Sequence, residues 1–377
     1  MKIMRPLGAV GIVASAALVL AACGSDPAAS NTPAANTSGA APAATATAPV
    51  DCGGKSPLSA EGSTAQKNAV DIFVLKYSQK CQGQQVNYNP TGSGAGVKQF
   101  NANQVDFGGS DSPLSGADVA AAAKRCASPA WDIPMVVGPV AVGYKLSGVD
   151  KLVLTPQVVA KIFNGGIKNW NDPAIKAVKG NESFTFPDKP IQVISRSDES
   201  GTTDNFQKYL TAAAKGVWTQ GAGKAFKGGV GNGAAGSNGV ATAVKAADGA
   251  ISYVEGAFAT DGITPALIDS GSGGVELSAA NVGKSLDAAK FLNAGSNDLA
   301  LDLNGIYASN VPGAYPLLLT TYEIVCSKYS DASVSKAVKA FLTVAATDGQ
   351  QPLSAKGYVP LPDALQAKVL TAIKAIA

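Results

Sequence analysis

The chain has no histidine among its 377 residues. Histidine is the usual general base at neutral pH and the commonest metal ligand, so its absence excludes a Ser-His-Asp triad and a histidine-based metal centre. Charged residues are also few, at 15%. The 30 basic and 27 acidic side chains nearly balance, and 28 basic ones remain without Lys2 and Arg5. This balance gives no reason to expect a nucleic acid as partner.

Only the start of the chain carries a long apolar run. Lys2 and Arg5 precede the apolar residues 7–19, and Leu-Ala-Ala-Cys follows at residues 20–23. Residues 1–22 therefore read as a cleaved export signal. The last four residues resemble the bacterial lipoprotein box, which implies lipidation of Cys23 and attachment to the outer face of the cytoplasmic membrane. An ordinary signal peptide or an uncleaved anchor is the alternative.

The segment after Cys23 cannot form a core. Residues 27–49 are all Ala, Pro, Ser, Thr, Asn or Gly. Such a composition predicts a flexible tether over residues 23–53, ahead of the folded part.

The four remaining cysteines are an even number in an exported, oxidising context. Three pairings are possible, and free buried thiols are the alternative. Cys52 precedes a predicted strand and Cys81 ends the helix that follows it, so both fall at the same end of a sheet. This favours a Cys52–Cys81 disulfide, which leaves Cys126 with Cys326. The spacings match no zinc motif.

Beyond residue 53, short apolar runs alternate with helical patterns. This alternation favours an α/β fold with mixed, mainly parallel sheets. Residues 65–80, for example, place Phe73, Val74 and Tyr77 on one helical face. The expected strands cover residues 85–88, 105–108, 133–138, 140–146, 191–195, 250–254 and 317–326; further helices span 155–163 and 202–213 or begin near residues 115, 238, 331 and 362.

Four loops between predicted strands and helices combine glycine with small hydroxyl residues: 61–64, 91–96, 109–112 and 195–202. Helix N-termini present unpaired N–H groups and a positive dipole end, so such loops suit an anion. Arg196 adds a guanidinium whose fork geometry fits an oxyanion, and Asp198 can orient it. One loop alone is more typical of a turn and helix cap, but together they indicate an anion site.

Longer stretches match a known family. They include residues 91–98 (Thr-Gly-Ser-Gly-Ala-Gly-Val-Lys), 105–114 (Val-Asp-Phe-Gly-Gly-Ser-Asp-Ser-Pro-Leu), 161–173, 196–202, 253–255 and 315–322. In these stretches the chain resembles the phosphate-binding proteins of bacterial ABC importers, in an actinobacterial style. The resemblance implies a two-lobed periplasmic-binding-protein fold (type II) with a hinge. Lobe I would comprise residues 54–140 and 315–377, and lobe II residues 141–314.

The resemblance also implies which residues hold phosphate: Thr64, Ala65 through its backbone N–H, Ser93, Asp111, Arg196, Ser200, Gly201 and Thr202, with Asp198 supporting Arg196. Ala65 replaces the family's frequent Phe but keeps the backbone donor. Glu199 replaces the usual Gly, and we expect it to face solvent. The Gly-rich residues 228–239 are expected to be scaffold.

Asp111 is the most informative of these residues. An ionised carboxylate only accepts hydrogen bonds, and phosphate carries an O–H to donate whereas sulfate at neutral pH carries none. Asp111 would therefore reject sulfate by repulsion and by an unmatched acceptor.

The sequence thus predicts a monomeric, non-enzymatic carrier of inorganic phosphate that serves the membrane permease of an ABC transporter, without metal or cofactor. Two alternatives belong to other classes. One is a surface lipoprotein that keeps the fold for an interaction or adhesion role, and the other is a phosphate-ester hydrolase.

Overall fold

The computed structural model describes residues 50–286 and 289–377. The predicted signal peptide, Cys23 and residues 24–49 of the predicted tether lie outside this part of the chain. Within it, none of the helices combines the length and apolar character needed to cross a membrane.

Helices and strands alternate through most of the described chain. In order they are β1 (Leu58–Gly62), α1 (Lys67–Lys80), β2 (Val86–Pro90), α2 (Ser93–Asn101), β3 (Phe107–Ser110), α3 (Ala117–Cys126), β4 (Ala130–Lys145), β5 (Val153–Leu154), α4 (Pro156–Phe163), α5 (Pro173–Lys176), β6 (Gln192–Arg196), α6 (Gly201–Ala213), β7 (Asn232–Ala234), α7 (Gly236–Ala246), β8 (Ala250–Glu255), β9 (Thr264–Pro265), β10 (Leu267–Asp269), β11 (Gly274–Val275), α8 (Ala279–Leu286), β12 (Lys290–Phe291), β13 (Leu301–Asp302), α9 (Asn304–Tyr307), β14 (Leu318–Cys326), α10 (Ala332–Ala346), η1 (Ser354–Lys356) and α11 (Asp363–Ala375).

One mixed sheet organises the described residues, in the order β2-β1-β3-β14-β4-β8-β6-β7 with β9 beside β4. Its two ends are parallel, because β1 pairs with β2 and β3, and β6 pairs with β7 and β8, in the parallel sense. The central pairs are antiparallel. The predicted mixed α/β class is confirmed.

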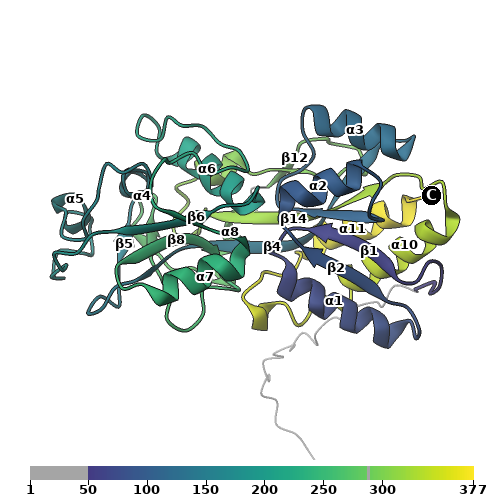
Figure 1. Cartoon of the computed structure of the whole chain (residues 1–377), viewed down its shortest axis with the longest axis horizontal. Coiled ribbons are helices and arrows are strands. Elements are labelled where there is room, and N and C mark those ends of the chain that lie inside the picture. Colours follow the sequence, from purple (N-terminus) through teal and green to yellow (C-terminus); the bar gives the residue numbers. More distant parts are fainter. Residues whose placement is uncertain (1–49, 287–288) are drawn as a thin grey trace, which may run out of the picture. The chain divides into compact units, whose positions relative to one another are not determined.

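The parallel ends explain how the helices cover the sheet. α1 connects β1 to β2, at the edge of the sheet, and α2 connects β2 back past β1 to β3. Both crossovers are right-handed but run in opposite directions along the sheet, so α1 and α2 lie on opposite faces of it. Figure 1 shows this arrangement, and the same one for α6 and α7 around β6 and β8. In open sheets of this kind, ligands bind beyond the carboxyl ends of strands at such reversals.

The two strands predicted at residues 133–138 and 140–146 are one strand, β4. Pro139, between the two predicted strands, stands where β4 changes partner. Residues up to Pro139 pair with β14, and residues from Val140 pair with β8. A missing N–H is tolerated at such a point. The predicted lobe boundary at residue 140 therefore falls inside a continuous strand.

Helix starts differ slightly from the predictions. α1 begins at Lys67 rather than at residue 65, because residues 63–66 form the turn that follows β1. α3 begins at Ala117 rather than near residue 115, because Gly116, with a φ of 55°, still belongs to the preceding loop. Thr155 does cap α4, with its side chain accepting from the Val158 N–H at 3.3 Å.

Both predicted disulfides, Cys52–Cys81 and Cys126–Cys326, are confirmed. The first ties the entry of β1 to the end of α1. The second ties the end of α3 to the end of β14, across a separation of 200 residues. A cross-link of that span removes many unfolded conformations, so it is expected to contribute several kcal/mol to stability, about 2–5 by the usual range.

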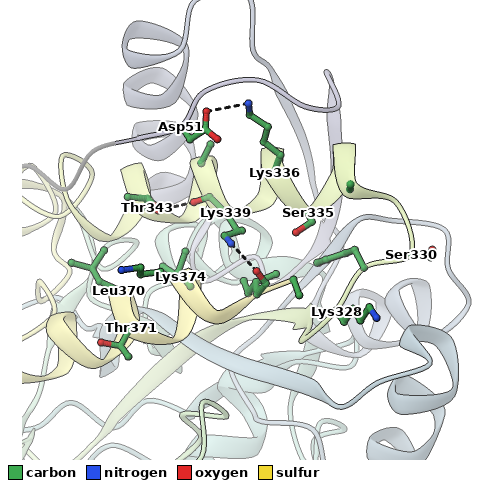
Figure 2. Close-up of a pocket in the computed structure, with 16 residues that line it drawn as sticks. Asp51, Lys328, Ser330, Ser335, Lys336, Lys339, Thr343, Leu370, Thr371 and Lys374 are labelled. Carbon is green, nitrogen blue, oxygen red and sulfur yellow. Dashed lines mark hydrogen bonds and ion pairs between the residues drawn. The ribbon is translucent and has the colours of Figure 1, made fainter.

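A groove of about 860 Å³ lies along α10 and α11 near the C-terminus. Figure 2 shows Lys339 donating to the backbone oxygen of Ile376 at 2.7 Å, and Lys336 paired with Asp51 at 3.0 Å. The first described residues therefore run beside α10, on a different part of the fold from the strand ends described next.

Candidate functional site

The carboxyl ends of β1 and β3 lie unusually close together. A side chain on Gly62 would place its Cβ 2.0 Å from the Gly109 backbone oxygen, so only glycine fits there. This close approach brings Ser63, directly after Gly62, into contact with Asp111, two residues after Gly109. The Ser63 hydroxyl donates to Asp111 Oδ1 at 2.5 Å.

Asp111 is the centre of this site. Its Oδ1 accepts from the hydroxyls of Ser63 and Thr321, at 2.5 and 2.7 Å, and its Oδ2 accepts from the Ser93 hydroxyl at 3.0 Å. The residue is 2% exposed. Burial raises its pKa to about 6, against the lowering effect of the three hydroxyls. A carboxylate offers about four lone-pair positions. Three are used here, which leaves one acceptor position on Oδ2.

Two helix N-termini converge on that oxygen. Ser93 is the first residue of α2 and Gly201 the first of α6. A Cβ on Gly201 would lie 2.6 Å from the Asp111 Cβ and 2.7 Å from the Ser93 Oγ, so α6 begins directly against both. Ser200 caps α6 by accepting from the Thr203 N–H at 3.3 Å. The first N–H groups of a helix have no intrahelical acceptor and can bind an anion. At the start of α2 one of them is already used, since the Gly94 N–H donates to the Glu199 backbone oxygen at 2.9 Å.

Asn205 fixes α6 in this position. Its side-chain amide donates to the Asp111 backbone oxygen at 2.6 Å and to the Gly201 backbone oxygen at 2.9 Å. The Tyr307 hydroxyl in turn donates to the Asn205 side-chain oxygen at 2.6 Å. These buried bonds join the two ends of the sheet at the site.

Arg196 supplies the fixed positive charge, at the end of β6. It is 5% exposed, and its Nε and one terminal nitrogen donate to the two oxygens of Asp198 at 2.7 and 2.5 Å. Burial acts to raise the pKa of Asp198, but the hydrogen bond and charge of Arg196 outweigh it and hold that pKa below its usual value. The predicted orienting role of Asp198 agrees with this geometry.

Thr64 and Ser237 connect Arg196 to the end of β1. Their hydroxyl oxygens lie 2.9 Å apart, and the Ser237 N–H donates to Thr64 Oγ1 at 3.1 Å. The other terminal nitrogen of Arg196 donates to Ser237 Oγ at 3.4 Å. Ser237 belongs to the Gly-rich stretch expected to be scaffold, so that expectation misses a direct contact with the site.

The Thr202 hydroxyl donates to Oε1 of Glu255, at the end of β8. Glu255 is 1% exposed, and its Oε2 has no hydrogen-bond partner within the described residues. Asp111, Asp198 and Glu255 thus outnumber the single guanidinium. An anion here must be held chiefly by N–H and O–H donors rather than by net charge.

Two positions fit the predicted roles differently. The backbone N–H of Ala65 donates to Ser63 Oγ at 3.1 Å, so the structure directs this donor at Ser63. Glu199 faces solvent as expected, since its side chain is 49% exposed and pairs with Lys98 at 2.6 Å.

The structure adds Ser63, Thr321, Ser237, Glu255 and Asn205 to the predicted set. Most lie in sequence stretches that were recognised, but nothing local marks them. Thr321 and Asp111 are 210 residues apart in sequence and Thr64 and Ser237 are 173 apart, so only the folded topology brings them together. Over the described residues, no group of three His, Cys, Asp or Glu side chains is arranged to hold a metal.

Known proteins share this fold and sequence. A family model described as a PBP superfamily domain matches residues 27–348. The subatomic-resolution structure of a high-affinity periplasmic phosphate-binding protein (PfluDING) bound with phosphate superposes with a TM-score of 0.66 at 25% identity, covering 84% of this chain and 93% of that one.

Phosphate-binding protein PstS3 of Mycobacterium bovis BCG is 50% identical, and phosphate-binding protein PstS 2 of Mycobacterium tuberculosis is 46% identical. Both alignments cover 100% of this chain and of the relative. The chain therefore belongs to the PstS family of phosphate-binding proteins.

Proposed function

We propose that this protein captures inorganic phosphate outside the cytoplasm and delivers it to the permease of an ABC transporter. One observation supports this most directly: two helix N-termini and a buried guanidinium surround an aspartate that keeps one free acceptor position. Such a site offers many donors to an anion and one acceptor to its O–H. That combination suits phosphate and disfavours a fully ionised oxyanion.

In this proposal each site residue has a defined part. Asp198 holds the guanidinium through the Nε fork, and Arg196 binds phosphate through the N–H groups of its terminal nitrogens that Asp198 leaves open. Ser93, Ser200, Gly201 and Thr202 donate from the starts of α2 and α6. The hydroxyl of Thr64 and the N–H of Ala65 donate from the turn after β1. This requires the present bonds of Thr64 and Ala65 to be exchanged for bonds to the ligand. Asp111 accepts the ligand O–H on Oδ2.

The two ends of the sheet would act as lobes that close on the ligand by a hinge motion. Residues 54–140 and 315–377 supply Asp111 and Ser93, whereas residues 141–314 supply Arg196 and the start of α6. A ligand that contacts both parts favours the closed form, and the permease can recognise that form.

Lipidation of Cys23 would hold the carrier at the outer face of the membrane. Residues 24–49 then connect the anchor to the folded part beside α10. We propose that the carrier works as a monomer and makes or breaks no bond. Absence of phosphate-ester turnover by the purified protein would support this, whereas turnover lost on Arg196 substitution would contradict it.

Calorimetric titration of residues 24–377, unfolded and refolded to remove carried ligand, tests the proposal. We expect one phosphate per chain and no heat with sulfate at pH 7. An R196A variant is the matched negative, and K98A, at the exposed Lys98–Glu199 pair, is the matched positive. If the wild type and K98A bind neither anion, the proposed function is wrong.

A further inference from the structure

A second buried carboxyl group, Glu323, lies behind the Asp111 site. It is on β14, 0% exposed, and pairs across the sheet with Gly109 of β3 and Ile133 of β4. Neither of its carboxyl oxygens has a hydrogen-bond partner within the described residues. An ionised carboxylate buried without partners is strongly disfavoured, so this environment selects the neutral acid.

Gln66 and Tyr88 occupy the space that Gly109 leaves open beside Glu323. A Cβ on Gly109 would lie 2.4 Å from Gln66 Nε2 and 2.6 Å from the Tyr88 hydroxyl. Gln66 Nε2 donates to the Tyr88 hydroxyl at 3.1 Å, but Gln66 Oε1 has no partner. A proton on Glu323 would supply the donor that Gln66 Oε1 lacks.

This group of side chains leads to Asp111. The Tyr88 hydroxyl donates to the Ser63 backbone oxygen at 2.8 Å, and the Ser63 hydroxyl donates to Asp111. Thr321, which also donates to Asp111, is two residues from Glu323 on the same strand, so both side chains point to the same face. Glu323 therefore lies on the same face of β14 as Thr321 and next to the side chains that lead through Tyr88 and Ser63 to Asp111.

The charges around Glu323 reinforce its neutral form. Burial raises its pKa to about 8 and the charge of Asp111 raises it further, whereas the neighbouring Gln66 side chain lowers it. Tyr88, from β2, is the other titratable group beside it, and Glu61, from β1, acts on Tyr88. From β4 the facing residue is the apolar Ile133.

We propose that Glu323 is a proton-holding positioning residue that makes phosphate affinity depend on pH. The inference rests on the proposed function. Neutral Glu323 completes the hydrogen-bond chain to Asp111 without adding charge. Once ionised, it places a second negative charge behind the anion and leaves Gln66 Oε1 without its donor. Phosphate binding must then be accompanied by proton uptake at Glu323.

The test compares the phosphate Kd of the wild type with that of E323Q from pH 6.5 to pH 9.5. The ligand titrates identically in both measurements, and Asp111, with a pKa of about 6, is largely ionised in both proteins above pH 7, so the trend of the ratio above pH 7 reports Glu323. We expect the ratio of wild-type Kd to E323Q Kd to rise with pH, by about tenfold for each pKa unit that bound phosphate adds to Glu323. E276Q, at an exposed loop position, should show no such trend.

A second measurement does not depend on the folding of a variant. Carboxyl carbon NMR of the wild type should give Glu323 a pKa near 8 without ligand and a higher one with phosphate. A flat Kd ratio across the pH range, or a ligand-free pKa below 6, overturns the inference. If the wild type does not bind phosphate at pH 7, the proposed function fails, while the ligand-free titration still decides whether Glu323 holds a proton.

Discussion

Replacing Asp111 with asparagine should convert the site from one that selects phosphate into one that accepts sulfate. The geometry fixes how the amide would sit. Two hydroxyls, from Ser63 and Thr321, donate to Oδ1, whereas one, from Ser93, donates to Oδ2. The asparagine oxygen is therefore expected at the Oδ1 position, where it keeps two donors. The amide nitrogen then takes the Oδ2 position, beside the start of α6, and donates to the ligand.

The magnitude follows from the bond that is lost and the charge that is removed. A hydrogen bond to a charged group contributes about 1.5–3 kcal/mol. For phosphate this bond disappears in D111N, whereas for sulfate the repulsive, unmatched carboxylate is replaced by a donor. The preference for phosphate over sulfate should therefore fall by about 10- to 150-fold.

Calorimetric titration at pH 7 with both anions measures that preference directly. D132N is the matched control, because Asp132 is also 2% exposed but accepts from the Leu114 N–H and not from the site hydroxyls. The control should keep the wild-type preference. If D111N and D132N discriminate equally well, Asp111 does not read the ligand proton.

Three further outcomes are expected. R196A should weaken phosphate binding by about 30-fold or more, because it leaves buried carboxylates without their cation. K98A, which removes one partner of an exposed ion pair, should change the phosphate Kd by less than about fivefold. Equal losses of affinity in calorimetry would argue against a special role for Arg196. G201A should abolish binding, because its Cβ would lie 2.6 Å from Asp111, whereas G283A, with no atom within 4 Å of the added Cβ, should bind normally; calorimetry beside urea unfolding separates binding from stability. Folding raises the pKa of Asp111 from 3.8 to about 6, so the stabilisation that its protonated form provides is complete below pH 3.8 and is lost as pH rises through 6. The unfolding free energy of the ligand-free wild type minus that of D111N should therefore fall by about 3 kcal/mol between these pH values. Urea titrations that give a constant difference would contradict this.

Local sequence patterns predicted the parts of the site that local structure determines. Arg196 and Asp198 are two residues apart on one loop, so their pairing follows from the motif. The helix predicted over residues 202–213 is α6, which begins at Gly201, within one residue of the expected start. The Cys52–Cys81 pairing follows from one strand and the helix after it. Each of these needs only neighbouring residues, and the pattern carries that information.

Contacts across the sheet could not be predicted in this way. Thr321 reaches Asp111 only because β14 is inserted antiparallel beside β3, and no local pattern sets that register. Ser237 contacts Thr64 only because the turn after β1 and the start of α7, which belong to opposite ends of the sheet, meet at the site. The single strand β4 was predicted as two, and Pro139 is acceptable within it because β14 is exchanged for β8 as partner at that point.

The balance of charge at the site explains why the carboxylates need such careful placement. One guanidinium faces three carboxylates, so net charge works against an anion and the attraction must come from helix N-termini and hydroxyls. The charge of Asp198 is balanced by Arg196, which donates to both of its carboxylate oxygens, and Glu255 accepts a hydrogen bond from the Thr202 hydroxyl. Asp111 keeps an acceptor position beside the starts of α2 and α6, and a further negative charge behind it would weaken the binding of an anion. A neutral Glu323 adds no such charge, so phosphate affinity should fall as its proton is lost with rising pH.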